Sequence, residues 1–127
     1  MKLWIDDARP APEGYIWCKS VNETKELIED LEKEQQYFYD MAFEFFHSGE
    51  RLAYHNVMKM CKRREIELLD IDHDSGDYNI DGGDYICLLD WLEETGRNYP
   101  IRIHSANPVG VANMRRIIQR NNWKEVF

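Results

Sequence analysis

The stretch that decides the fold is MKLWIDD, residues 1–7, in which a short apolar run ends abruptly in two aspartates. The same pattern returns in IELLDIDHD, residues 66–74, where an apolar run passes into Asp72-His73-Asp74. Short apolar runs that end in turn-forming or charged residues are typical of the buried strands of parallel sheets. The sequence therefore predicts two buried strands, each followed directly by carboxylates.

Two more strands are predicted around this pair. Residues 15–18 are rich in strand-forming side chains, and Pro100 opens a predicted strand at residues 101–104. Proline keeps the segment 9–14 out of a helix, so we expect a loop there. The tail, residues 123–127, fits either a short strand or a cover over the core.

Helices are predicted between these strands. A capping box at residues 20–23 starts a helical pattern that fits one long helix or two and ends at Ser48-Gly49. A further helix ends in the basic residues 62–64, where cations favour a helix C-terminus. The last two helices are expected from about Tyr85 to Thr95 and after the cap at Asn107-Pro108.

Strands that alternate with helices indicate an α/β domain with a mainly parallel sheet of four or five strands. We expect right-handed crossovers, with helices on both faces of the sheet. The 127 residues suffice for one domain and not for two, so the whole of 1–127 is predicted to be a single unit. In such folds ligands bind at the carboxyl ends of the strands.

Composition narrows the class of function. The chain is 43% hydrophobic and 31% charged, with a net charge of -8, which disfavours binding to an extended nucleic-acid duplex. No apolar run approaches the length that spans a membrane, and the N-terminus meets charge too early for an export signal. Three scattered cysteines without metal-site spacing fit a reducing compartment, so we expect a cytoplasmic protein.

The acidic residues at the strand ends are the candidate metal ligands. They are Asp6, Asp7, Asp72 and Asp74. Carboxylates that converge at one edge repel each other unless a cation neutralises them, and oxygen ligands suit Mg²⁺, Mn²⁺ or Ca²⁺. The competing interpretation is that these acids cap loops and stay solvated. Their repetition at separate strand ends favours a metal and phosphate site.

Other polar residues near these ends have candidate roles in chemistry. His73 and His104 are candidates for proton transfer near neutral pH. Ser105 is expected to hydrogen-bond a phosphoryl oxygen, with nucleophilic attack as the less favoured role. Arg9 either reaches a phosphate or neutralises the acids, and Asn107 either caps a helix or contacts substrate.

Three segments together resemble the cyclic-phosphate-processing receiver-like domains. These segments are residues 1–14, then Asp72-His73-Asp74 with Gly76, then the run His104-Ser105-Ala106-Asn107-Pro108 with Met114-Arg115. The resemblance spans residues 1–31 and 66–120 and implies a receiver-like, flavodoxin-like three-layer sandwich. Residues 32–65 stand out as a helical insertion, a candidate lid or homodimer surface.

The resemblance also implies site roles and leaves three hypotheses for function. By this likeness Asp6 and Asp7 match the acidic pair that holds Mg²⁺ in receivers, Asp72 the phosphoacceptor region and Ser105 the hydroxyl residue. The first hypothesis is a phosphoesterase dependent on Mg²⁺ or Mn²⁺, acting on a cyclic phosphate or a phosphorylated nucleotide or RNA end. The second is a non-catalytic module that binds a phosphorylated ligand or a protein partner. A phosphoacceptor domain is third, because no lysine can be placed after a fifth strand, where receivers carry one; Lys124 is only a candidate in the tail.

Overall fold

The computed structural model describes residues 1–127 and is built on one sheet of four parallel strands. The strands are β1 (Lys2–Ile5), β2 (Tyr15–Cys18), β3 (Leu68–Ile71) and β4 (Ile101–Ile103). Their order across the sheet is β2-β1-β3-β4, and a single parallel bridge between Ile101 and Glu125 adds the tail beside β4. This is the strand order of flavodoxin-like folds. The receiver-like α/β fold expected from the sequence is therefore confirmed.

Four α-helices and one 3₁₀ helix connect the strands. They are α1 (Val21–Ser48), α2 (Arg51–Arg63), η1 (Gly76–Ile80), α3 (Ile86–Glu94) and α4 (Pro108–Arg120). The predicted caps are present: the Ser20 side chain accepts from the backbone N–H of Glu23, and Asn107 caps α4 with Pro108 in its first turn. None of the helices combines the length and apolarity that a bilayer crossing needs.

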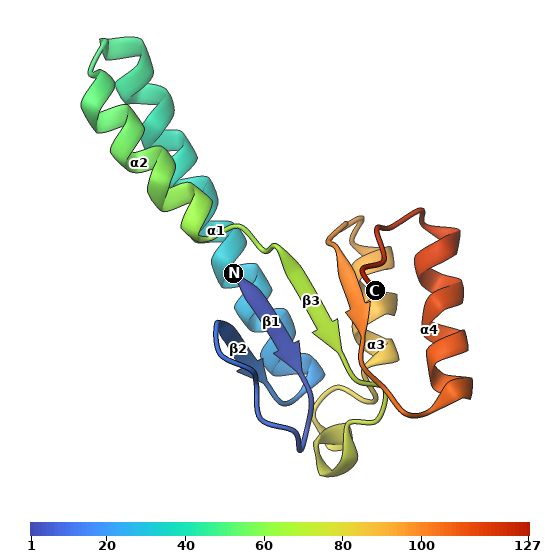
Figure 1. The fold of residues 1–127 in the computed structure, drawn as a ribbon. Helices are drawn as coiled ribbons and strands as arrows, with labels where there is room; N and C mark the ends of the chain where they lie inside the picture. The colour runs from blue at the N-terminus through green and yellow to red at the C-terminus, as the bar shows by residue number, and fades with distance from the viewer.

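The core lies between one face of the sheet and helices α1, α3 and α4. Leu3, Ile5, Leu69 and Ile71 point to this face and are fully buried. Right-handed crossovers from β2 to β3, β3 to β4 and β4 to the tail all place their helices on the same face. Figure 1 shows α1 and α3 behind the sheet.

The opposite face of the sheet is crossed by the segment 6–14, which connects β1 to β2 without a helix. The indole of Trp4 donates to the carbonyl of Arg9 at 2.8 Å, and that of Trp17 donates to the carbonyl of Asp6 at 2.7 Å. These bonds hold the segment against the sheet. The expected helices on both faces are thus found on one face only, because the prolines of this connection keep it extended.

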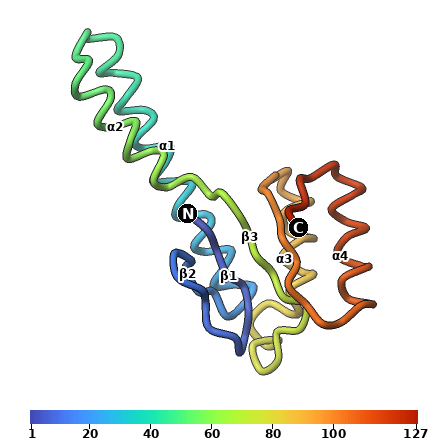
Figure 2. The backbone as a smooth tube through the Cα atoms, viewed as in Figure 1, coloured from blue at the N-terminus to red at the C-terminus, as the bar shows by residue number.

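Helix α1 is one continuous helix, which settles the choice between one helix and two. Its first part packs on the sheet through Ile28 and Leu31, whereas its second part extends beyond the sheet and pairs with α2. Gly49, with φ of 78°, permits the tight turn between the two helices. We call residues 35–63 the hairpin; Figure 2 shows it projecting from the end of the sheet where the strands begin.

Candidate functional site

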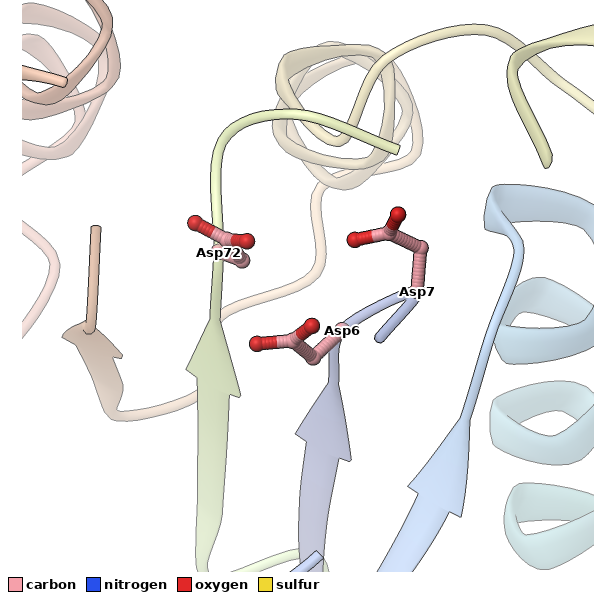
Figure 3. A group of neighbouring side chains, drawn as sticks. All are labelled: Asp6, Asp7 and Asp72. Atoms are coloured by element: carbon pink, nitrogen blue, oxygen red, sulfur yellow. The ribbon is translucent and has the colours of Figure 1, made fainter. Parts of the chain in front are cut away.

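Three carboxylates converge where β1 and β3 end. Asp6 and Asp7 follow β1 and Asp72 follows β3, and the register that pairs Ile5 with Ile71 brings these ends side by side. One carboxylate oxygen from each residue lies within 4.8 Å of the other two (Figure 3). Asp74 is not among them, because its exposed carboxylate pairs with the ring of His73 at 2.9 Å.

The environment of Asp6 holds it in its charged form. Burial by itself raises the pKa of this carboxyl, but hydrogen bonds from the backbone N–H groups of Arg9 and Ala8 and from His104 bring the pKa below its usual range. The guanidinium of Arg9 adds an ion pair at 3.1 Å. Asp6 is therefore a fixed negative charge and the most deeply buried of the three carboxylates.

Asp7 has the opposite character. Burial raises the pKa of its carboxyl, and the negative charges of Asp6 and Asp72 raise it further. The backbone of the loop after β3 approaches the Asp7 side chain closely. Gly76 in this loop has φ of 55°, and a Cβ at its position would collide with the Asp7 carboxylate. Asp7 is thus crowded by like charge, which is the condition that a bound cation relieves.

His104 is largely enclosed, and both of its ring nitrogens face carboxylates. Its Nδ1 lies 2.6 Å from Asp70 Oδ1 and its Nε2 lies 2.9 Å from Asp6 Oδ2. The ring stacks on Trp4, with 3.7 Å between centroids. Ionised carboxylates can only accept, so both contacts are satisfied together when the imidazole carries both protons. His104 therefore connects and orients two buried acids.

Asp70 is the site residue that the sequence analysis missed. Its side chain is 1% exposed, and its second oxygen, Oδ2, has no hydrogen-bond partner. A signal was present in the sequence, because a charged residue inside an otherwise apolar strand is rarely buried without a partner. The partner, His104, lies 34 residues away along the chain.

His73 is placed differently from His104. Its Nδ1 faces the Asp74 carboxylate and, at 3.4 Å, the amide of Asn107, whereas its Nε2 is engaged by no protein group. Gly110 in the first turn of α4 lies directly against the ring, where any Cβ would collide with it. The structure thus fixes this imidazole on one side and leaves one nitrogen free.

The remaining candidates lie around this group. Arg9 Nη2 is 3.5 Å from Asp72 and donates to the carbonyl of His104, while its side chain stays 56% exposed. Asn107 accepts from the N–H of Gly110 as the cap of α4, and Ser105 Oγ accepts from the N–H of Asn107. Lys124 lies next to Ile101, the first residue of β4, and so stands at the opposite end of the sheet from the acids.

The donor set fits a hard divalent cation. Three carboxylate oxygens without sulfur or imidazole nitrogen are the ligands that Mg²⁺ and Mn²⁺ prefer. Asp7 supplies the crowded negative charge that such an ion would neutralise. Asp6, Asp7 and Asp72 are accordingly the residues that would hold the ion.

The chain matches the model of a known protein family. The family model described as the cyclic-phosphate processing receiver domain matches residues 1–50 and 48–120. The matched ranges are wider than residues 1–31 and 66–120, which carry the resemblance in the sequence, because they also include residues 32–65. No curated protein and no solved structure matches the chain.

Proposed function

Because the chain belongs to the cyclic-phosphate processing receiver domain family, we propose that it is a phosphoesterase dependent on Mg²⁺ or Mn²⁺. Its substrate would be a cyclic phosphate or a phosphorylated nucleotide or RNA end. The observation that carries the proposal is the convergence of Asp6, Asp7 and Asp72 within 4.8 Å. A divalent cation held there would draw charge from a phosphoryl oxygen and activate water.

Proton transfer is assigned to His73. Its ring is oriented by Asp74 through Nδ1, and no protein group engages its Nε2. This arrangement of an imidazole oriented by a carboxylate is common in acid–base catalysis. As water adds to phosphorus and the ester P–O bond breaks, protonated His73 would give a proton to the leaving oxygen, and a proton lost by the attacking water would restore the imidazolium. His104, with both nitrogens engaged, is instead assigned to orienting Asp6.

The substrate's negative charge has two candidate partners at the rim. Arg9 is more than half exposed and lies across Asp6 and Asp72, so its guanidinium can turn toward a phosphate. Ser105 follows His104 directly and is proposed to donate its hydroxyl to a phosphoryl oxygen. Asn107 is assigned to capping α4 and to steadying His73, rather than to contacting substrate.

The test is turnover of 2′,3′-cyclic nucleotides and of a generic phosphodiester, with Mg²⁺ or Mn²⁺ added. We expect hydrolysis by the wild type that Asp72→Ala abolishes. A matched control is Asp77→Ala, which removes an exposed acid in the same loop region but outside the three-carboxylate group. Equal activity in the two variants would contradict the proposed site.

The same protein samples separate the alternatives. A rise in melting temperature with metal but no turnover on any phosphoester would favour a non-catalytic module that binds a phosphorylated ligand. Incubation with acetyl phosphate followed by mass measurement tests for a phosphoacceptor. We expect no phosphorylated protein, because Lys124 lies at the far end of the sheet from Asp72.

A further inference from the structure

The hairpin inverts the usual placement of apolar side chains. Its buried residues are small or medium in size, namely Ala42, Val57 and Cys61. Several of its aromatic residues face outward instead, with Phe43 65% and Phe46 64% exposed. Two helices that project from a domain can cover only one side of each other, so the hairpin lacks the second layer that helical bundles normally have.

Phe43, Phe46 and two tyrosines line one groove between the two helices. The groove has a volume of about 320 Å³. It is lined by six hydrophobic residues, namely Tyr39, Ala42, Phe43, Phe46, Tyr54 and Met58. Positions 39, 43 and 46 on α1, and 54 and 58 on α2, recur at helical spacing, so each helix presents a continuous apolar stripe. An exposed stripe of this kind marks an interaction surface.

The charges beside the groove differ in sign between the two helices. On α1 the exposed acids Asp40 and Glu44 lie beside the apolar stripe, whereas α2 carries Arg51, Lys59, Lys62 and Arg63 and no acidic residue. A partner that places a basic helix against α1 and an acidic helix against α2 would complement both. A second copy of the hairpin is such a partner, because its basic α2 can lie against α1 and its acidic α1 against α2.

We propose that the groove is a homodimer interface, in which two hairpins pack face to face as a four-helix bundle. A two-fold axis along the hairpin sets α1 of each copy against α2 of its partner, so acids meet bases and every neighbouring pair of helices is antiparallel. The alternative two-fold arrangement would set α1 against α1 and acid against acid. This proposal is independent of the phosphoesterase activity, since the three carboxylates follow the ends of β1 and β3 (Figure 3), whereas the hairpin projects from the end of the sheet where the strands begin (Figure 1).

The first test measures the mass of the full chain by sedimentation velocity over a range of micromolar concentrations. We expect twice the mass of one chain for the wild type, and one chain for the variant Phe43→Ser with Phe46→Ser. The matched control is Leu52→Ser, an equally apolar and 77% exposed residue of the hairpin that does not line the groove. Circular dichroism reports whether each variant keeps its helices.

The second test distinguishes the arrangement of the helices. Lys59→Glu with Lys62→Glu makes both flanks acidic, and Asp40→Lys with Glu44→Lys makes both basic. We expect each reversed variant to be monomeric and an equal mixture of the two to form a heterodimer. A wild type that stays monomeric throughout, or a dimer that Phe43→Ser with Phe46→Ser leaves intact, would overturn the proposal.

Discussion

At the scale of single residues, the site is a chain of buried contacts from Asp70 through His104 to Asp6. The two acids come from β3 and from the end of β1, and the histidine follows β4, so three separate strands meet in one imidazole. Trp4 covers the flat side of the ring. Because Asp6 has little freedom in this arrangement, it is available as a preorganised ligand.

Removing one end of this chain should destabilise the fold. Asp70→Ala leaves His104 Nδ1 without its carboxylate in a buried position, and a buried polar group left without a partner costs about 1–3 kcal/mol. Urea unfolding at neutral pH measures the loss. Asp70→Asn retains an oxygen acceptor and should lose clearly less. A loss below about 1 kcal/mol for Asp70→Ala, as for an ordinary surface position, would contradict the network.

Asp7 should behave as a residue kept for function at the expense of stability. Two like charges about 4 Å apart repel by about 1 kcal/mol even in water, so Asp7→Asn should raise the free energy of unfolding by about that amount in the absence of metal. Adding Mg²⁺ should stabilise the wild type more than the variant, because the variant lacks one ligand. Thermal unfolding with and without Mg²⁺ tests both parts. A variant less stable than the wild type without metal would contradict the crowding.

The difference in the free energy of unfolding between Asp7→Asn and the wild type should depend on pH in one direction. The folded-state pKa of Asp7 is raised, first by burial and then by Asp6 and Asp72. Its contribution to stability is therefore present below the unfolded-state pKa and is lost as the pH rises through the folded-state value. The increase in the free energy of unfolding caused by Asp7→Asn should be largest at neutral pH. It should shrink as the pH falls through the folded-state pKa of Asp7. Urea unfolding at a series of pH values measures it, and a gain that grows on acidification would refute it.

At the scale of elements, the loop after β3 is fastened to the start of α1. Ser20 Oγ accepts from the N–H of Glu23 and donates to Asp81 Oδ2 at 2.6 Å, and the Asn22 side chain donates to the same carboxylate. These bonds lower the pKa of Asp81. The cap of one helix thus also positions the loop that brings Gly76 against Asp7.

Substituting the cap should therefore act on both the helix and the loop. Ser20→Ala is expected to cost about 1–2 kcal/mol of stability as the loss of an N-cap. Its effect should be non-additive with Asp81→Ala, because each substitution removes the same hydrogen bond. Urea unfolding of the two single variants and the double variant gives the coupling. Asp77→Ala, an exposed acid in η1, serves as the uncoupled control, and strict additivity with Asp81→Ala would contradict the anchor.

What the sequence predicts at this scale follows from local rules. The cap at Ser20, the stop at Gly49 and the proline start of α4 each depend on a few adjacent residues, and all three are found. The sequence does not decide whether residues 21–48 form one helix or two, because the charged residues 32–34 interrupt the apolar pattern. In the fold Glu32 accepts from Arg97 and Tyr99, so this polar turn of the helix has partners from a distant loop.

At the scale of the whole molecule, the candidate site and the hairpin occupy opposite ends of the sheet (Figure 1). The convergence of Asp6, Asp7 and Asp72 could be predicted, because the carboxyl ends of parallel strands share one edge. The burial of Asp70, the enclosure of His104 and the departure of Asp74 could not, since they depend on which side chains meet across strands. In the proposed dimer, the hairpins would join two copies at one end of the sheet and leave the candidate site at the other end uncovered.

Hydrogen exchange should reveal this division within one protein sample. Hairpin amides near residues 39–58 are covered on their outer side only in the proposed dimer, so they open once the dimer dissociates. Their exchange should slow as protein concentration rises, whereas that of β1 and β3, which belong to the buried sheet, should not change. Mass spectrometry of peptides at two concentrations measures both regions, with Phe43→Ser and Phe46→Ser together as the control that removes the dependence. Hairpin amides that exchange equally fast at both concentrations would mean that no second copy covers them, and the apolar groove would then need a different occupant.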